Sequence, residues 1–366
     1  MILGTGTQGH LGAEQMIKQN NTQPKKVSAY TQAGVDIDSK MAGIEAIKNM
    51  AATTKTKGVV GGIGSFGGLF QSPGTDTLLV ASTDGVGTKL KVAAMAKKHD
   101  TVGQDLVNHC VNDILVQGAK PLFFLDYIGA ARFSSQVFAE IVSGLVKACQ
   151  ENNCALLGGE TAEMPGLYPM GEYDLVGTIV GAVGKRNIIT GKNIKPGDII
   201  IGLPSGGLQT NGFALARKVI FDQSGLTPRD LIPGTRLTTS EALLAIHRSF
   251  LKPVSALMTK KIPIQGMAHI TGGGFVDNIP RVLPDNCNAV IDRTSWFVPT
   301  IFTFIERQGK VERDEMYRVF NMGIGYVIIV RPRYLTAAMD TLKKHCPNPA
   351  IIGAIEKGNR HVLYKN

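Results

Sequence analysis

One stretch of the chain combines a carboxylate, two glycines and a lysine in a pattern that suits phosphate and metal chemistry. It reads Ser82-Thr83-Asp84-Gly85-Val86-Gly87-Thr88-Lys89 and directly follows the apolar run 78–81. A strand that ends in an acid, then lets a ligand approach its backbone through glycines, then offers an ammonium group can meet a metal-bound phosphate. On spacing alone, an ordinary turn with a solvated acid and base explains Asp84 and Lys89 equally well.

A second polar group lies in a segment with helical periodicity, residues 101–117. Its members recur at spacings of three and four residues and so share one part of a helix surface: Asp105, Asn108, His109, Asn112 and Asp113. Buried polar groups destabilise a fold unless they are paired, so this face either binds something or is exposed to water. If it binds a metal, Asp84, Asn112 and Asp113 offer the oxygen ligands that Mg²⁺ prefers.

Other candidate residues lie at strand ends and in glycine-rich turns. Glu160 follows two glycines at the end of an expected strand, where a carboxylate can bind metal or act on substrate. The turns 205–213 and 269–275 lead into helices, so their free N–H groups and the positive helix end favour a phosphate. His269 begins the second turn, and by itself a histidine there is more commonly a hydrogen-bonded core residue.

A further glycine-rich segment, Gly62-Ile63-Gly64-Ser65-Phe66-Gly67, matches the dinucleotide-binding pattern G-x-G-x-x-G. The pattern requires a helix that opens at its third glycine, but Pro73 and its polar neighbours interrupt any such helix. A loop over a nucleotide is therefore favoured over a dinucleotide fold, with a plain surface turn as the alternative. The chain also lacks the P-loop pattern G-x-x-x-x-G-K-[ST], so ATP would be bound in another way.

Composition narrows the class of protein. The net charge of +10 suits an anionic partner, but the lysines and arginines occur as isolated pairs, which favours a small phosphorylated substrate over nucleic acid. The five cysteines form no C-x-x-C pair, which argues against disulfides and zinc. No apolar run reaches the roughly 18 residues of a membrane span, and the N-terminal residues lack a basic region followed by an apolar core. We expect a cytoplasmic protein without a membrane partner.

The 366 residues predict two α/β units that position these groups. Helices are expected over 101–117, 135–152 and 334–345, and strands over 122–128, 155–160, 175–183, 199–203 and 326–330. A polar connector, residues 184–198, marks the boundary. The predicted parts are a flexible N-terminal extension, a first domain and a second domain: 1–29, 30–184 and 185–366.

Several motifs occur in one fixed order along the chain: Ala33-Gly34-Val35-Asp36-Ile37-Asp38, Thr83–Lys89, Val111-Asn112-Asp113, Pro121–Tyr127, Gly158–Gly166, Ser205-Gly206 with Asn211-Gly212, His269–Phe275, Asn278–Pro284 and Glu315–Arg318. Together they closely resemble the phosphoribosylformylglycinamidine cyclo-ligase family. The resemblance extends from about Tyr30 to the C-terminus, and the residues before Tyr30 do not share it.

The resemblance implies an ATP-dependent ring closure in purine synthesis. The formyl amide oxygen of formylglycinamidine ribonucleotide takes the γ-phosphoryl group, and the amidine nitrogen then displaces phosphate from this iminophosphate. The products are 5-aminoimidazole ribonucleotide, ADP and phosphate. The implied cofactors are ATP and Mg²⁺, whose charge and position this chemistry needs.

The resemblance also implies roles for residues. ATP is assigned to Lys48, Gly64, Ser65, Asp84, Gly85, Lys89, Asn112 and Asp113, and the metal to Asp84, Asn112 and Asp113. Catalytic roles fall on Glu160, Lys89 and His269, and the substrate phosphate on Ser205, Asn211, Gly272, Gly273 and Gly274. The implied architecture is a homodimer in which the N-terminal domains form a β-barrel and the C-terminal α/β domain packs outside it. The sequence by itself does not show dimerisation.

Two departures and three alternatives remain. Many relatives carry histidine and serine at the positions of Gln209 and Thr210, so proton transfer is not assigned there, and the lysine expected after Tyr30 is Thr31. A sister enzyme such as selenophosphate synthetase or thiamine-phosphate kinase would share the acidic cluster, although the first needs a cysteine earlier than Cys110. A glutamine amidotransferase would need a nucleophilic cysteine domain. A non-catalytic purine-nucleotide sensor would have little reason to keep all the acidic residues.

Overall fold

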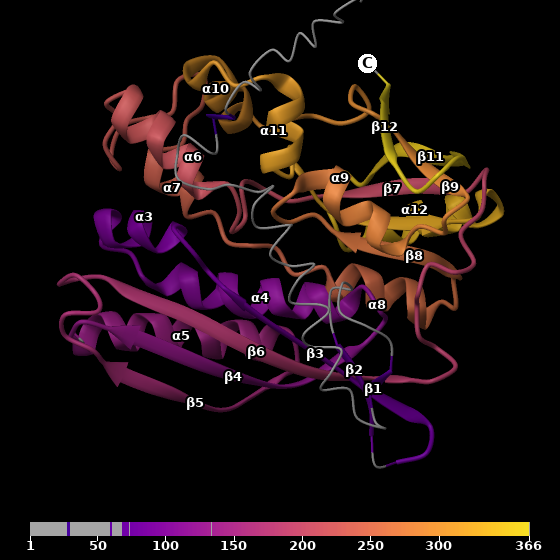
Figure 1. Ribbon diagram of the computed structural model, residues 1–366, viewed down its shortest axis with the longest axis horizontal. Coiled ribbons are helices and arrows are strands. Elements are labelled where there is room, and N and C mark those ends of the chain that lie inside the picture. The colour runs from indigo at the N-terminus through magenta and orange to yellow at the C-terminus, as the bar shows by residue number, and fades with distance from the viewer. Residues whose placement is uncertain (1–27, 30–58, 61–67, 73, 133, 366) are drawn as a thin grey trace, which may run out of the picture.

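The computed structural model describes residues 28–29, 59–60, 68–72, 74–132 and 134–365, which form two six-stranded sheets with helices packed on them (Figure 1). This confirms the α/β class. The expectations for the N-terminal extension and for Lys48, Gly64 and Ser65 lie outside the described residues. The first sheet ends at Gly184 and the second begins at Ile199, so the predicted boundary falls directly after the last strand of the first sheet.

The first sheet has the order β1-β2-β3-β6-β4-β5, with β4 and β5 parallel and the other pairs antiparallel. Its strands are β1 (Val59–Val60), β2 (Gly68–Gln71), β3 (Thr77–Gly85), β4 (Lys120–Ala130), β5 (Ala155–Glu163) and β6 (Tyr173–Gly184). Along β6 every second residue from Tyr173 is buried, because side chains of a strand alternate between the two faces. The buried face packs on helices and the other face is left without a covering layer in the described part of the chain.

Two helices cover the buried face, α4 (Asp100–Leu115) and α5 (Ser135–Glu151), preceded by α3 (Lys89–Ala96). The two helices cross closely because glycines meet at the crossing. A Cβ on Gly103 would lie 2.3 Å from the carbonyl oxygen of Ile141, and one on Gly144 would lie 2.5 Å from that of Asp100. The absence of side chains at these glycines lets α4 and α5 pack closely, which fixes the position of α4 on the sheet.

The second sheet has the order β12-β9-β11-β7-β10-β8, parallel only between β12 and β9. Its strands are β7 (Ile199–Pro204), β8 (Ile264–His269), β9 (Cys287–Asp292), β10 (Ile324–Val330), β11 (Ala350–Lys357) and β12 (Val362–Lys365). Strand β10 is fully buried, as its continuous apolar sequence predicts. The predicted helix 334–345 is not the last element of the domain, because β11 and β12 follow it and enter the sheet beside β7 and β9.

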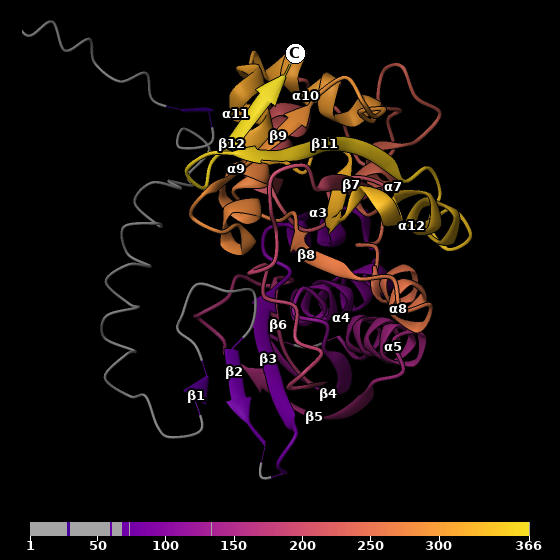
Figure 2. The same ribbon diagram turned by 90° about the vertical axis from the view of Figure 1, so that its right-hand side faces the viewer.

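Short helices surround the second sheet. They are α6 (Phe213–Arg217) with a π-helical turn at Lys218–Gln223, α7 (Thr239–Leu243), α8 (Leu251–Thr259), α9 (Gly274–Asn278), α10 (Thr300–Gly309), α11 (Arg313–Val319) and α12 (Leu335–Leu342), with 3₁₀ turns at Ile279–Val282 and Pro332–Tyr334. Helices α3 and α4 contact α7 and α8 of this second unit, and Figure 2 shows α4 beside α8.

The polar face of α4 binds the backbone of the segment 245–250, which lies between α7 and α8 and has no regular structure. Asp105 accepts the N–H of His247 at 2.7 Å, and Asn108 donates to the carbonyl of the same residue at 2.8 Å. Asn112 donates to the carbonyl of Arg248 at 2.8 Å and accepts the N–H of Phe250 at 2.9 Å. The polar groups of α4 are therefore buried and paired, and the alternative of an exposed helix face is wrong.

The expected barrel is not seen in the single chain. The first sheet stays open from β1 to β5 in the described residues, so no closed barrel is seen. Within the same residues, none of the helices combines the length and the apolar character that a membrane crossing requires.

A substitution at Asn112 tests how much the contact between α4 and the segment 245–250 stabilises the protein. We expect Asn112→Ala to lower the free energy of unfolding by about 2 to 4 kcal/mol, because it leaves a buried N–H and a buried carbonyl without partners. Urea unfolding followed by circular dichroism measures this. Gln136→Ala, on the exposed side of α5, is the matched control and should change the stability by less than about 0.5 kcal/mol. Equal effects of the two variants would contradict this account of the interface.

Candidate active site at the domain interface

A chain of hydrogen bonds begins at Asp84, the last acid of β3, and crosses from the first unit into the second. The Asp84 Oδ2 lies 2.7 Å from Nε2 of His109 on α4, and Nδ1 of His109 lies 2.7 Å from the hydroxyl of Thr210. Asp84 keeps 41% of its side-chain surface exposed, whereas His109 and Thr210 are buried. Asp84 is therefore the solvent-facing end of this chain.

The same chain continues through two more histidines to Asp113. The Thr210 hydroxyl lies 3.2 Å from Nδ1 of His247, and Nε2 of His247 lies 3.0 Å from Nε2 of His269. Nδ1 of His269 lies 2.8 Å from Asp113, whose second oxygen accepts the hydroxyl of Ser82 at 3.0 Å. The three imidazole rings have centroids 5.0 to 5.1 Å apart, so they form one compact cluster.

The partners assign the protons in this chain. Because Asp113 accepts from Nδ1 of His269, the other nitrogen of that ring accepts from His247, and His247 in turn accepts the Thr210 hydroxyl proton. The Thr210 oxygen then accepts from His109, which also donates to Asp84. In this arrangement every contact is satisfied when His109 carries two protons and the other two rings are neutral.

The electrostatics of the cluster agree with this assignment. Burial opposes the charge on His109, but the adjoining Asp84 carboxylate outweighs it and raises the pKa of His109 to about 9. Burial alone would raise the pKa of Asp84, yet the same contact holds it at about 2. Burial lowers the pKa of His247, and the rings of His109 and His269, which can carry positive charge, lower it further. Burial also lowers the pKa of His269. The cluster thus holds one imidazolium between two carboxylates.

Lys89 occupies a different position from the one its motif indicates. Its ammonium group has no exposed surface and lies 2.8 Å from the buried Asp105 carboxylate. It also donates to the carbonyls of Gln209 at 3.0 Å and Ala245 at 2.8 Å. Lys89 therefore ties the end of the Asp84 turn to two loops of the second unit, and its three contacts leave the ammonium directed into the interface. Asn112 is used in the same way, because both ends of its amide bind backbone.

The glycine-rich turns of the second unit meet beside the cluster. Asn211 donates weakly to the Thr210 hydroxyl at 3.4 Å, and its Oδ1 would lie 3.2 Å from a Cβ on Gly272. Gly273 has φ +92° and Gly274 has φ +59°, and a Cβ on Gly274 would lie 1.9 Å from the carbonyl oxygen of Tyr317, so neither position accommodates a side chain. Gly272 is exposed, which leaves the open side of this turn next to Asn211. Ser205 is buried, and its hydroxyl contacts Gly207 and Asn321.

Glu160 lies away from the other candidates. It is opposite Tyr127 in the register of β4 and β5, and Tyr127 is opposite Val176 of β6, on the uncovered face of the first sheet. Asp84 points to the other face, toward α4. Within the single chain, the structure therefore brings Asp84, Asp113 and His269 together and does not bring Glu160 to them.

Sequence reasoning did not select three members of the cluster as site residues. His109 was noticed on the polar face of α4, and its spacing from Asp105 and Asp113 was the available signal. Thr210 was noticed only as a departure. His247 lies in an irregular segment without a motif, and only the packing of that segment against α4 brings it to His269.

Gln209 has an αL backbone at φ +62°, and its buried side-chain amide has no hydrogen-bond partner among the described residues.

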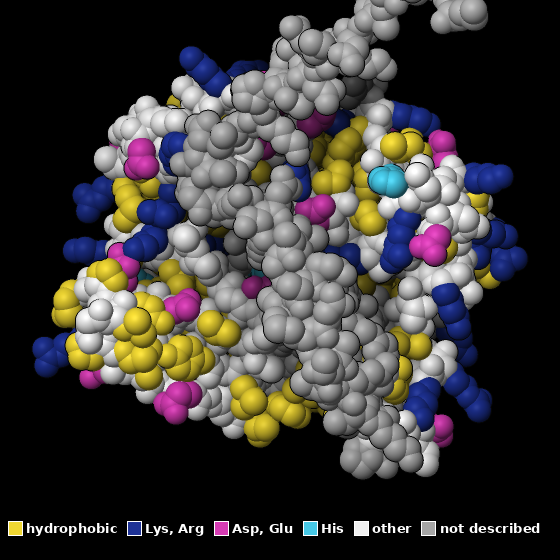
Figure 3. Space-filling view, in the orientation of Figure 1, with side chains coloured by type: hydrophobic (Ala, Val, Ile, Leu, Met, Phe, Trp, Pro, Cys, Tyr) yellow, Lys and Arg dark blue, Asp and Glu magenta, His cyan; other side chains and the backbone are white. Residues whose placement is uncertain are grey.

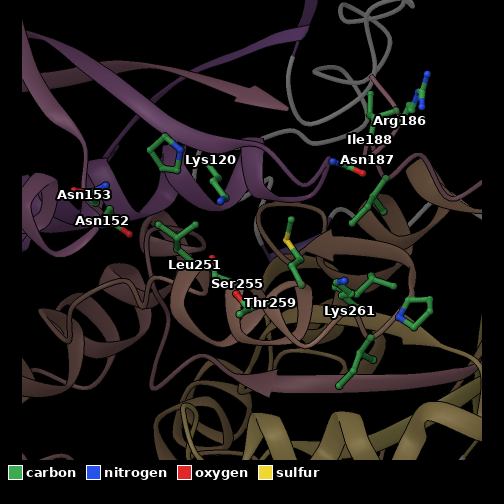
Figure 4. Close-up of a pocket in the computed structure, with 16 residues that line it drawn as sticks. Lys120, Asn152, Asn153, Arg186, Asn187, Ile188, Leu251, Ser255, Thr259 and Lys261 are labelled. Carbon is green, nitrogen blue, oxygen red and sulfur yellow. The ribbon is translucent and has the colours of Figure 1, made fainter. Parts of the chain in front are cut away.

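A separate cavity of about 790 Å³ lies between the units at another place (Figure 4). Lys120 lines it from the side of β4, and Ser255 and Thr259 of α8 line the facing wall. None of the cluster residues is among the described residues that line it, and these include no acid. It therefore does not contain the carboxylates on which the candidate chemistry depends.

Comparison with known proteins identifies the family. Residues 64–183 match the family model for the N-terminal domain of AIR synthase related protein, and residues 195–366 match the model for its C-terminal domain. The phosphoribosylformylglycinamidine cyclo-ligase of Thermoanaerobacter sp. (strain X514) is 48% identical over 335 residues, which are 91% of this chain and 99% of the relative. The chain belongs to the phosphoribosylformylglycinamidine cyclo-ligase family. Another cyclo-ligase, from Lawsonia intracellularis (strain PHE/MN1-00), is 49% identical over 90% of this chain and 95% of its own length.

Solved structures share the fold of this cyclo-ligase family member at low sequence identity. Thiamine-monophosphate kinase from Stenotrophomonas maltophilia K279a matches with a TM-score of 0.60 and 18% identity, over 86% of this chain and 94% of its own. The hydrogenase maturation protein HypE in complex with ATP matches with a TM-score of 0.60 and 17% identity, over 81% of this chain and 83% of its own. These matches support the two-unit architecture.

The raised pKa of His109 predicts how stability depends on pH. The pKa of His109 is about 9 in the folded state, against an ordinary value of 6.5. The His109–Asp84 pair therefore stabilises fully below pH 6.5, and this contribution is lost as the pH rises through 9. Wild type and His109→Gln should therefore differ most in melting temperature near pH 6 and progressively less toward pH 9.5. His345→Gln, at an exposed position, serves as control. A difference that stays constant from pH 6 to 9.5 would show that His109 does not carry this charge.

Proposed function

We propose that this chain catalyses the ATP-dependent cyclisation of formylglycinamidine ribonucleotide to 5-aminoimidazole ribonucleotide in purine biosynthesis. The observation that carries the proposal is the 48% identity to a curated cyclo-ligase over 99% of that relative's length. The interface site is compatible with it, since two carboxylates from the first unit lie beside a glycine-rich turn from the second. An enzyme that joins a nucleotide phosphate to a substrate needs both kinds of group at one place.

The proposed reaction has two steps. The formyl amide oxygen attacks the γ-phosphorus, the bond from γ-phosphorus to the bridging oxygen breaks, and ADP leaves. The amidine nitrogen then attacks the iminophosphate carbon, the carbon–oxygen bond breaks, and phosphate leaves as the ring closes and a proton is released. The enzyme's task is to hold the two reacting groups in contact and to exclude water from the phosphorylated intermediate.

Of the three positions assigned to the metal, Asp84 fits Mg²⁺ best, because Asp113 is buried and its two oxygens already contact His269 and Ser82. Asp84 has an exposed carboxylate, and Mg²⁺ commonly uses one or two carboxylates together with phosphate oxygens and water. Asn112 does not fit, because its oxygen accepts the Phe250 N–H. We therefore propose Asp84 as the Mg²⁺ ligand, with the Gly85 and Gly87 turn beside the triphosphate. When bound, the ion would neutralise charge on the transferred phosphate.

Other residue roles are proposed on the same basis. Asn211 and the turn Gly272–Gly274 are proposed to bind the substrate phosphate, because a side-chain amide and an open glycine turn offer donors without bulk. Lys89 and Asn112 are proposed as positioning residues that hold the Asp84 turn and α4 against the second unit. The roles of Glu160, Lys48, Gly64 and Ser65 stay predictions. His269 is proposed to act through Asp113, with which it shares a hydrogen bond.

A sister activity is less favoured. The matched thiamine-monophosphate kinase is only 18% identical, and a likeness at that level supports the fold alone. The curated relatives with 45% to 49% identity are named cyclo-ligases instead. A non-catalytic sensor remains as an outcome of the test, because nucleotide binding alone does not distinguish it from the enzyme.

The activity test uses purified full-length protein with Mg-ATP, with and without formylglycinamidine ribonucleotide. We expect ADP release that depends on the substrate and equals the formation of the aminoimidazole product. Asp84→Asn should lower kcat/KM at least about 100-fold, because it removes a charge at the reacting phosphate. Asp285→Asn, whose side chain is 93% exposed in the second unit, is the matched control and should keep wild-type activity. ATP binding without turnover would favour the sensor instead.

We further propose that the chain forms a homodimer through the uncovered face of the first sheet. Leu157 on β5 is 63% exposed, and Leu122 and Leu125 on β4 are also exposed. Hydrophobic side chains gather over the region of β4, β5 and β6 in the space-filling view (Figure 3). An apolar sheet face of this kind marks an interaction surface in most proteins. The closed barrel of the family architecture would arise if two such sheets met, and Glu160 lies on this same face.

The dimer proposal is tested by the double substitution Leu125→Glu with Leu157→Glu. Wild type should elute and sediment as a dimer, and the double variant should become a monomer, because four buried carboxylates per interface would cost several kcal/mol. Leu237→Glu, at an exposed loop position of the second unit, is the matched control and should remain a dimer. Wild type that sediments as a monomer at micromolar concentration would exclude the proposal.

A further inference from the structure

The cavity of about 790 Å³ between the two units lies away from the histidine cluster. It is lined by Ile264, the first residue of β8, whereas His269 of the cluster is the last residue of the same strand. A strand of this length separates the two residues by about 16 Å. Pockets that bind small molecules commonly have volumes of about 300 to 1,000 Å³. The cavity is therefore a second place at which a ligand can contact both units.

Positive charge lines this cavity from three directions. Lys120 begins β4, Arg186 lies in the connector after β6, and Lys261 follows α8. None of these three side chains makes a hydrogen bond or an ion pair with another described residue, and the described lining contains no acid. A cleft lined by charges of one sign concentrates the opposite ion from solution. The cavity is thus suited to an anion.

Neutral hydrogen-bond donors accompany the three cations. The side chains of Asn187, Ser255 and Thr259 line the cavity and have no hydrogen-bond partner in the part of the chain that the structure describes. Lys120 and Asn187 lie on one side of the cavity, and Ser255, Thr259 and Lys261 lie on the other (Figure 4). Ammonium groups only donate hydrogen bonds, and a phosphate group offers three strong acceptor oxygens. Donors on facing walls therefore favour a phosphate over a carboxylate, which has two oxygens.

The apolar part of the lining indicates that this phosphate is attached to a larger group. Leu251 and Met258 of α8 contribute to one wall, and Ile188 of the connector contributes to another. Methionine makes favourable contacts with aromatic rings, and an asparagine amide can both donate to and accept from a heterocyclic base. Asn153 and Asn187 provide such amides in the same lining. A nucleobase satisfies both the apolar and the amide groups.

We propose that this cavity binds a nucleoside phosphate at a site separate from the catalytic one. The cationic side chains bind the phosphate, and the base lies against Leu251 and Met258, within reach of the asparagine amides. The proposal does not rest on the cyclo-ligase activity, because it concerns residues that have no part in the proposed reaction.

One wall of the cavity belongs to the contact between the units. Asn152 lines the cavity, and its amide donates to Asn108 of α4 at 2.8 Å and accepts the hydroxyl of Ser249 at 2.6 Å. Asn108 in turn donates to the carbonyl of His247 at 2.8 Å. A ligand that contacts β4, the connector and α8 together binds only the docked arrangement. Its binding therefore stabilises that arrangement against unfolding.

The experiment uses AMP as the probe and the full-length protein without Mg²⁺ or substrate. Isothermal titration calorimetry measures the binding of AMP, adenosine and inorganic phosphate in separate titrations. We expect AMP to bind with a Kd below about 1 mM and the two fragments to bind at least about 10-fold more weakly, because the cavity uses both parts of the molecule. AMP at about 100 times its Kd should raise the melting temperature by about 2 to 4 °C.

Charge-reversal variants locate the site. Lys120→Glu and Lys261→Glu should each weaken AMP binding at least about 10-fold, because each puts a negative charge beside the phosphate. Both positions are exposed, so the fold should tolerate the change, which circular dichroism checks. Lys344→Glu makes the same change at an exposed position outside the described lining and is the matched control. Asp84→Asn should also bind AMP as wild type does, because Asp84 does not line the cavity.

Three results would overturn the proposal. Wild type that shows no AMP binding up to several millimolar excludes the site. Binding that survives both cavity substitutions but changes in Asp84→Asn assigns AMP to the catalytic site instead. Inorganic phosphate that binds as tightly as AMP shows an anion site without recognition of a nucleoside. The separate product assay decides cyclisation, so either proposal can fail while the other stands.

Discussion

The pairing of α4 with the irregular segment 245–250 is the constraint on which the rest of the structure depends. Its side chains satisfy backbone groups of that segment, and the buried Lys89–Asp105 contact joins the same elements. These groups would be costly to bury without partners, so the two units are stable together only in a narrow range of positions. The histidine cluster exists because this docking puts His247 and His269 next to His109.

The arrangement gives neighbouring residues of one helix separate tasks. Asn112 binds backbone of the second unit, whereas Asp113, one residue later, contacts His269 and Ser82. A helix turns by about 100° per residue, so consecutive side chains point to different surroundings. Docking and chemistry are consequently supplied by the same element, and a shift of α4 would disturb both.

Much of the fold could be predicted from sequence periodicity, but the assignment of the polar groups could not. The expected helix over 101–117 and strand over 175–183 correspond to α4 and β6, since their apolar patterns are long and regular. The strands β11 and β12 were missed because Gly353 interrupts the apolar run of the first, the second has only four residues, and both follow an amphipathic helix that resembles the end of a domain. The residues Lys89 and Asn112 were predicted to bind phosphate and metal or else to face solvent, but spacing along a helix does not reveal that a partner is a backbone carbonyl 136 residues away.

The docking contacts of α4 have a consequence for how this interface tolerates sequence change. Asp105, Asn108 and Asn112 bind N–H and C=O groups of the segment 245–250, which every amino acid except proline provides. These particular contacts therefore do not depend on which side chains the segment carries. Main-chain groups of the segment thus contribute to the alignment of the two units, whereas the side chain of His247 contributes to the histidine cluster, so one short segment serves both purposes through different atoms.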